Sequence, residues 1–325
     1  MTKTIYIKLT NACNLKCKHC YNEILHNHSN MSKNILEKVI IYLKSLNTNN
    51  EEIDIHLHGG EPFMYDISNI QYLLYKTKNL NFKWTITTNL IYEITKEHLD
   101  IFKQMLPFDN NPFILTSWDY KIRFKDDQQE LWENNVRLLK ENNINVQPII
   151  CLTNILIKEK EPEEIFKYFT DKDIYNFNFE RITNTGRALD NNLRPYNIDL
   201  QNWLLKAYKL YEKNNKLKIP LFEGIKQSIN GIFLGCRNRS CMNDVITINP
   251  DGTIAGCPNT CDKKYGNLDK IDTKIKENLI NLEKQRSINC LTCKFFKYCN
   301  GDCFQLIFDE TGCPGMKSIY SYILD

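Results

Sequence analysis

The segment NACNLKCKHCY, residues 11–21, follows directly after a short apolar stretch, Ile5–Leu9, that has the composition of a β-strand. Its cysteines have the spacing C-x3-C-x2-C: Cys13, Cys17 and Cys20. Three thiolates on one loop can bind three irons of a [4Fe–4S] cluster and leave the fourth iron without a protein ligand. Zinc would need a fourth ligand, and His19 is awkwardly placed for that inside the same loop. The segment therefore predicts an iron–sulfur site at the end of a strand.

Around this loop, strand-like and helix-like segments alternate from residue 1 to about residue 190. The expected strands are Ile5–Leu9, Ile53–His58, Phe82–Thr88, Phe113–Ser117, Ile144–Ile150 and Tyr175–Ile182. The expected helices follow Ser32 and span Ile67–Thr77, Leu131–Lys140 and Pro162–Phe169. Such βα units with right-handed crossovers form a parallel sheet that is open or partly closed into a barrel. Ligands then gather at the carboxyl ends of the strands.

The composition narrows the class of protein. The chain has 325 residues with 42 Lys+Arg and 39 Asp+Glu, so its formal charge of +3 argues against a nucleic-acid binder. It contains no apolar run long enough to span a membrane, and its polar N-terminus does not resemble a secretory signal. A cytoplasmic location follows. In that reducing compartment the 13 cysteines are expected to bind metal rather than to form disulfides.

The distribution of cysteines divides the chain. Three lie in residues 13–20, Cys151 stands alone, and nine crowd into residues 236–313. We expect a barrel domain at residues 1–190, a linker with a helix near Asn202–Tyr211 at residues 191–230, and a small cysteine-rich α+β domain at residues 231–325. The last segment has too little apolar content to fold well without its metal.

Further motifs occur where the expected strands end. HGGEP (residues 58–62) ends the second strand, TTN (87–89) the third and SWD (117–119) the fourth. Together with the cysteine loop and the aromatic Tyr21 that follows it, these motifs resemble the radical S-adenosylmethionine (radical SAM) superfamily. The resemblance covers residues 1 to about 190, and it is looser at TTN, where Leu90 replaces a common glycine. It implies a partial (β/α)6 TIM-type barrel.

The resemblance also implies a site. The loop cysteines would hold a [4Fe–4S] cluster whose open iron binds the amine and carboxylate of S-adenosylmethionine (SAM). Tyr21 would lie against the adenine, and the GGEP backbone and acid against the amine. The residues expected at this cofactor are Tyr21, Gly59, Gly60, Glu61, Pro62, Asn89, Ser117, Asp119 and Arg181. Strand-end capping by Asn89 and Ser117, and a salt bridge at Arg181, are the structural alternatives.

The C-terminal cysteines have their own spacing pattern, C-x4-C-x10-G-x4-C followed by C-x2-C-x5-C-x3-C-x9-C. The pattern resembles the SPASM extension of radical SAM enzymes, which implies two auxiliary [4Fe–4S] clusters and three in all. By order, the nearer cluster would have Cys236, Cys241, Cys257 and Cys303, and the outer one Cys290, Cys293, Cys299 and Cys313. Cys261 can replace Cys236 as a ligand, and a pair of zinc ribbons is the alternative to clusters.

The combined resemblance implies a radical SAM/SPASM oxidoreductase that removes a hydrogen atom from a peptide. The expected reaction is a thioether or carbon–carbon cross-link in a ribosomally made precursor peptide, with electrons from a flavodoxin- or ferredoxin-type donor. The chain begins at its first strand, so leader recognition is expected from a separate protein or from the barrel mouth. No nucleic-acid or membrane partner is expected.

Three other functions are alternatives to the oxidative cross-link. A redox-neutral peptide epimerase would need a hydrogen-atom donor, for which Cys151 at the end of the fifth strand is the candidate. A formylglycine-forming sulfatase maturase generally has Asp directly after the third nearer-cluster cysteine, whereas Pro258 follows Cys257 here. A non-catalytic iron–sulfur electron carrier would need neither the open iron nor the GGEP motif.

Overall fold

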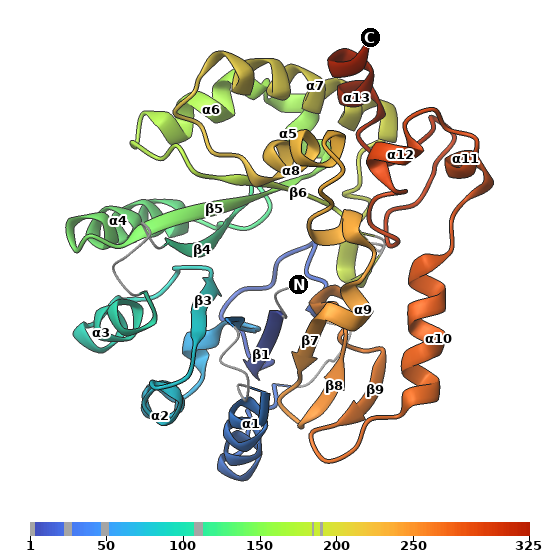
Figure 1. Ribbon diagram of the computed structural model, residues 1–325. Helices are drawn as coiled ribbons and strands as arrows, with labels where there is room; N and C mark the ends of the chain where they lie inside the picture. The colour runs from blue at the N-terminus through green and yellow to red at the C-terminus, as the bar shows by residue number, and fades with distance from the viewer. Residues whose placement is uncertain (1–3, 23–27, 47–51, 107–112, 184, 189–190) are drawn as a thin grey trace.

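The computed structural model describes residues 4–22, 28–46, 52–106, 113–183, 185–188 and 191–325. The described strands form one nine-stranded sheet in the order β6-β5-β4-β3-β2-β1-β7-β8-β9 (Figure 1). The strands are β1 (Thr4–Thr10), β2 (Ile53–Gly59), β3 (Phe82–Thr88), β4 (Phe113–Trp118), β5 (Asn145–Leu152), β6 (Asn178–Arg181), β7 (Val245–Ile248), β8 (Thr253–Ala255) and β9 (Lys264–Asn267). Strands β1 to β6 pair in parallel and in chain order, which confirms the α/β fold with an unclosed partial barrel.

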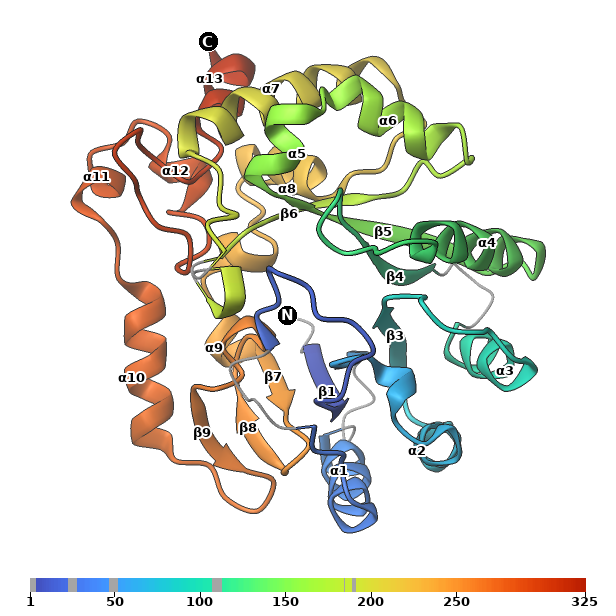
Figure 2. The same cartoon turned by 180° about the vertical axis from the view of Figure 1, so that it is seen from behind.

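Helices follow most strands and cover one side of the sheet. They are α1 (Lys33–Leu46), α2 (Ile67–Thr77), α3 (Lys96–Met105), α4 (Gln128–Glu141), α5 (Asn154–Glu159), α6 (Pro162–Thr170), α7 (Asn197–Lys213), α8 (Pro220–Ile229), α9 (Cys241–Asp244), α10 (Thr273–Lys284), α11 (Ile288–Leu291), α12 (Phe296–Cys299) and α13 (Lys317–Leu324). In both views α1 to α4 and α6 lie outside the curved sheet (Figures 1 and 2). Among the described residues no helix is both long and apolar enough to cross a bilayer.

The two faces of the sheet differ because successive side chains of a strand point to opposite sides. On β1, Ile5, Ile7 and Leu9 are fully buried in the main apolar core, which also takes in the apolar faces of the helices. Tyr6 and Lys8 point to the other, concave face, which we call the lumen face. The register carries this alternation across the sheet: Tyr6 pairs with His56, and Lys8 with His58. The lumen face is therefore polar near the cysteine loop.

The cysteine-rich region belongs to the same sheet. β7 pairs in parallel with β1, with Thr4 opposite Val245 and Ile7 opposite Ile248, and β8 and β9 continue as antiparallel strands. Residues 191–230, expected to be a linker with one helix, contain two helices. α7 packs against α6 and α13, and α8 packs against β6. Their buried side chains include Trp203, Tyr208 and Phe222.

Candidate active site

The loop after β1 brings the three predicted cysteines together. The backbone N–H of Cys20 donates to the carbonyl of Cys17 (3.2 Å), and that of Leu15 donates to the Cys13 thiol sulfur (3.4 Å). Burial raises the pKa of the Cys13 and Cys17 thiols, and negative charge on the neighbouring cysteines raises it further. Thiolates gathered in this way are stabilised by a bound metal centre, which holds its sulfur ligands deprotonated. The donor set fits a [4Fe–4S] cluster with three protein ligands.

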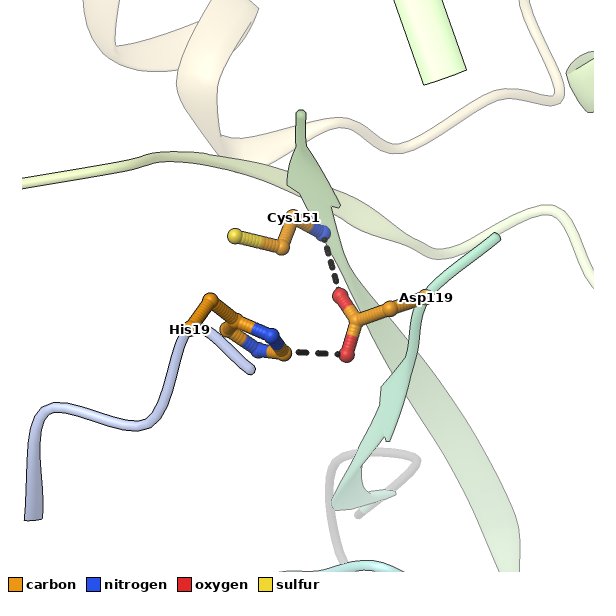
Figure 3. A group of neighbouring side chains, drawn as sticks. All are labelled: His19, Asp119 and Cys151. Carbon is orange, nitrogen blue, oxygen red and sulfur yellow. Dashed lines mark hydrogen bonds and ion pairs between the residues drawn. The ribbon is translucent and has the colours of Figure 1, made fainter. Parts of the chain in front are cut away.

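His19, the fourth ligand that zinc would need, has other partners. Its Nε2 lies 3.3 Å from Oδ2 of Asp119, which also accepts a hydrogen bond from Nε of Arg123. The second carboxylate oxygen, Oδ1, accepts from the backbone N–H of Cys151 (3.0 Å). Figure 3 shows Asp119 joining the cysteine loop to the end of β5. The carboxylate expected at the cofactor is thus already engaged by three protein groups.

The GGEP motif lies against the cysteine loop. The N–H of Gly60 donates to the carbonyl of Thr10 and the N–H of Glu61 to that of Ala12, both at 2.8 Å. A Cβ on Gly60 would be 2.1 Å from the Ala12 carbonyl oxygen, so only glycine permits this approach. The motif therefore closes on the loop that carries the cysteines.

Glu61 is the buried acid of this motif. It is 1% exposed, and its carboxylate accepts hydrogen bonds from Oγ1 of Thr88 (2.8 Å) and the backbone N–H of Asn89 (2.7 Å). Burial outweighs these hydrogen bonds and raises its pKa to about 7. A cationic ligand group at this site would stabilise the carboxylate and restore a lower pKa.

Tyr21 and Asn89 extend from the loop and from the end of β3. Nδ1 of His58 accepts from the N–H of Gly59 (2.8 Å), so Nε2 carries the hydrogen and donates to the Tyr21 hydroxyl (2.9 Å). Asn89 donates from Nδ2 to Oδ1 of Asn14 in the cysteine loop (2.7 Å). Both residues lie beside the predicted cluster, while Ser117 lies on the lumen face of β4 opposite Ile149 of β5.

Arg181 has a different environment from the one expected at the cofactor. Its guanidinium makes a two-pronged ion pair with Asp302, with Nη1 and Nη2 at 2.8 and 2.9 Å from the two carboxylate oxygens. The side chains are only 10% and 3% exposed. This pairing matches the structural alternative of a salt-bridged arginine, and it ties β6 to the loop between Cys299 and Cys303.

The nearer auxiliary site is assembled from three separate segments. The Cys236 thiol is hydrogen-bonded to both Cys241 and Cys303, and this lowers its pKa. The sulfur of Cys257 accepts from Nε2 of Gln305 (3.7 Å), and its pKa is raised by burial and by the charge of Cys236. Four mutually interacting thiols of this kind fit a fully ligated cubane cluster.

Cys261 is turned away from that group. It is 1% exposed, and its sulfur lies 3.2 Å from Nζ of the fully buried Lys8, which also donates to Oδ1 of Asn22. This placement favours Cys236 over Cys261 as the fourth ligand of the nearer site.

The outer auxiliary site surrounds a cavity of about 110 Å³ that is lined in part by Cys290, Cys299 and Cys313. A Cβ on Gly315 would lie 3.3 Å from the sulfur of Cys299 and 3.4 Å from that of Cys313. Glycine thus leaves room beside the sulfur atoms, and the charge of Cys293 acts on Cys313. The residues present fit a second auxiliary cluster.

The fold and these cysteine sites define an iron–sulfur protein built on a partial α/β barrel. The family model of the Radical SAM superfamily matches residues 7–171, about half of the chain, and the chain belongs to that superfamily. This confirms the family predicted from the cysteine loop and GGEP. Members of the family use a [4Fe–4S] cluster and SAM.

Two relatives align along nearly the whole chain. The radical SAM cyclopropyl synthase TigE of Paramaledivibacter caminithermalis is 25% identical, over 95% of this chain and 69% of the relative. A cysteine-type anaerobic sulfatase-maturating enzyme of Clostridium perfringens (strain ATCC 13124) is 24% identical, over 90% of this chain and 86% of the relative.

Two solved structures share the fold. Native anSMEcpe with bound AdoMet and Cp18Cys peptide superposes with a TM-score of 0.80 at 20% identity, over 98% of this chain and 96% of that one. Streptococcus suis SuiB bound to its precursor peptide SuiA gives 0.66 at 18% identity, over 95% of this chain and 74% of that one.

Proposed function

We propose that this chain is a radical SAM oxidoreductase that modifies a peptide through the loss of two hydrogens. The carrying observation is that the cysteine loop and the nearer auxiliary site both border the lumen face. Asp119, which accepts a hydrogen bond from the backbone N–H of Cys151, lies 3.3 Å from His19 of the cysteine loop. Burial raises the pKa of the Tyr6 phenol on the lumen face, and the charges of Cys257, Glu180 and Cys236 raise it further. A substrate in the lumen would lie between a radical source and an electron acceptor. One relative, TigE, is a radical SAM enzyme by name, and the solved structure of anSMEcpe contains bound AdoMet and a peptide.

Each group of residues has a task in this proposal. When bound, the cluster and SAM supply a 5′-deoxyadenosyl radical that removes a hydrogen atom from the substrate. Cys13, Cys17 and Cys20 hold the cluster, the Gly60 backbone and the Glu61 carboxylate receive the SAM amine, and Tyr21 supports the adenine. The eight SPASM-type cysteines would hold two auxiliary clusters without an open iron, which suits electron transfer rather than substrate binding.

Two other reactions have specific support. Sulfatase maturation is supported by the 24% identity with the Clostridium perfringens enzyme, while Pro258 after Cys257 removes the Asp expected in that family. Epimerisation is supported by Cys151, because burial raises the pKa of its thiol and keeps it in the S–H form that can donate a hydrogen atom.

Turnover in deuterated water separates these reactions. The assay contains the anaerobically reconstituted protein, reductant, SAM and the small peptide encoded beside the gene, and it is read by mass spectrometry. Loss of two mass units with formation of 5′-deoxyadenosine supports the oxidative cross-link, whereas a gain of one unit indicates epimerisation. A parallel reaction with a cysteine-containing sulfatase peptide tests for formylglycine. Product without added leader-binding protein would place leader recognition on this chain.

A further inference from the structure

A carboxylate that the sequence did not single out lies on the lumen face of the edge strand β6. Phe179 points to the helix side, where it contacts Phe166 of α6, Trp203 of α7 and Phe222 of α8. Its neighbour Glu180 therefore points to the lumen, since successive side chains alternate.

The register places Glu180 beside the SAM end of the lumen. Its Cα is paired with that of Cys151 on β5, and the backbone N–H of Cys151 is held by Asp119 at the end of β4. The charges of Glu180, Asp119 and Cys17 all act on the Cys151 thiol. Glu180 is thus paired with Cys151, which is linked through Asp119 to His19 of the cysteine loop.

Glu180 also faces the nearer auxiliary site. Three charged groups act on the pKa of Glu180. The negative charges of Cys236 and Asp302 raise it, because they disfavour the ionised carboxylate, and the positive charge of Arg181 lowers it. The charges of Glu180 and Cys236 act together on the phenol of Tyr6, which projects from β1 at the other edge of the barrel arc. Glu180 therefore lies on the lumen face within electrostatic range of Cys151 on β5, Tyr6 on β1 and Cys236 of the nearer auxiliary site.

The other carboxylates near the two cysteine sites already have hydrogen-bond or ion-pair partners within the protein. Asp119 has three partners, Asp302 is paired with Arg181, and Glu61 accepts from Thr88 and Asn89. Among the residues that the structure describes, Glu180 has only a long contact from the side-chain amide of Asn178, at 3.5 Å.

The side chain of Glu180 is exposed to solvent, yet surrounding protein raises its pKa to about 7. A carboxylate with a pKa near the working pH is well suited to accept a proton.

We propose that Glu180 is the general base of the oxidative step, which accepts the proton from an N–H, O–H or S–H group of the substrate next to the radical carbon. The inference rests on the proposed function. As the heteroatom loses its proton to Glu180, one electron leaves the substrate for an oxidised [4Fe–4S] acceptor in the nearer auxiliary site. The radical carbon and the deprotonated heteroatom then form a single bond, or, where they are already bonded, a double bond. With the hydrogen atom already removed, the substrate has lost two hydrogens in total.

The test compares E180Q with E277Q. Glu277 is an exposed carboxylate on α10, a helix that packs against α9 and β9. A general base contributes about 10²-fold or more, so E180Q should form product at least about 10²-fold more slowly. E180Q should continue to produce 5′-deoxyadenosine and should bind the peptide as the wild type does. E180D, which keeps the carboxylate, should recover part of the rate. E277Q should behave as the wild type in every assay.

A measurement on the resting, fully reconstituted protein gives a readout that does not depend on turnover. Infrared difference spectra with ¹³C-labelled glutamate should show protonated carboxyl bands that disappear as the pH rises through about 7, because Glu61 and Glu180 both have a pKa near that value. The component assigned to Glu180 should be missing in E180Q and retained in E61Q. Titration of Glu180 in the ordinary acid range, or an E180Q variant with wild-type product rate and pH profile, would overturn the assignment. Wild-type protein that makes 5′-deoxyadenosine but leaves every peptide unchanged would instead refute the proposed function.

Discussion

Replacement of Arg181 by Met should destabilise the contact between β6 and the loop between Cys299 and Cys303. The variant keeps the length of the side chain but leaves the Asp302 carboxylate, 3% exposed, without its two-pronged partner. At the 2.8 Å separation the direct attraction is about 6 kcal/mol for an effective dielectric constant of about 20. Most of this is offset by the cost of desolvating both ions, but removal of one partner from such a pair typically costs about 3–5 kcal/mol.

The assay is thermal unfolding of the reconstituted protein under anaerobic conditions, together with the rate at which a chelator removes iron. A loss of about 3–5 kcal/mol should lower the Tm by about 4–7 °C in a chain of this length. Iron should be released faster, because Asp302 lies in the loop between Cys299 and Cys303. The matched control is K167M, which breaks an exposed pair with Asp171 on the surface of α6, at 74% and 56% exposure. That change should cost no more than about 0.5 kcal/mol.

A double-mutant cycle with D302N distinguishes the pair from the packing of the arginine stem. The double variant R181M/D302N should be more stable than the sum of the two single changes predicts, because it contains neither the unpaired Asp302 carboxylate of R181M nor the unpaired Arg181 cation of D302N. Arg237, which lies 4.0 Å from Asp302, loses that partner in both D302N and the double variant, so its contribution cancels in the cycle. An R181M variant that unfolds like K167M, or strictly additive single changes, would refute the reasoning.

Three further perturbations test the site. Gly60→Ala should weaken SAM binding by about tenfold or more, because its Cβ would lie 2.1 Å from the Ala12 carbonyl oxygen; unchanged affinity in equilibrium dialysis would contradict the close approach. Cys236→Ser should lower the iron content from about twelve per chain, whereas Cys261→Ser should keep it, and the reverse result would exchange the two assignments. SAM affinity of the wild type should rise as the pH passes through about 7, because Glu61 is then ionised and suits a cationic amine. The rise should be absent in E61Q, and a pH profile shared by both proteins would exclude Glu61 as its origin.

The features that the sequence predicted well have local signals. Six strands were located from short β-branched runs, and the first, expected at Ile5–Leu9, spans Thr4–Thr10. The helix expected after Ser32 also has a local signal: Leu36, Val39, Ile40 and Leu43 repeat with the helical period and form the buried face of α1. The cysteine loop and GGEP were found because each is a contiguous motif at the end of a strand.

Some local signals were overlooked. Helix α3 was not expected, although Thr95 begins it and His98, Ile101, Phe102 and Met105 form a buried face. The helix α8 has Pro220 in its first turn, a position that proline favours, whereas the sequence pattern predicts a linker at residues 191–230. Both helices are short, and short apolar patterns are weak evidence for a helix by themselves.

Long-range pairings could not be predicted, because nothing near each residue indicates its partner. Arg181 and Asp302 are 121 residues apart, and Lys8 and Cys261 are 253 apart. Glu180 was missed for a related reason. One acidic residue in a short strand is ordinary in sequence. Its importance depends on the sheet, in which its side chain points to the lumen face and the neighbouring Arg181 pairs with Asp302 instead.

The pairing of β7 with β1 explains why two distant cysteine groups can serve one substrate. In a closed barrel β1 would pair with the last strand, and the space between them would be lost. Here β1 pairs with β7 instead, with Tyr6 opposite Thr247, so β1 and β6 are not paired, and the charge of Cys236 acts on side chains of both strands, Tyr6 and Glu180. The same strand β1 continues into the loop of Cys13. Because one strand positions both cysteine groups, their separation is fixed by sheet hydrogen bonds rather than by a linker, and the proposed peptide substrate would meet both at a constant distance.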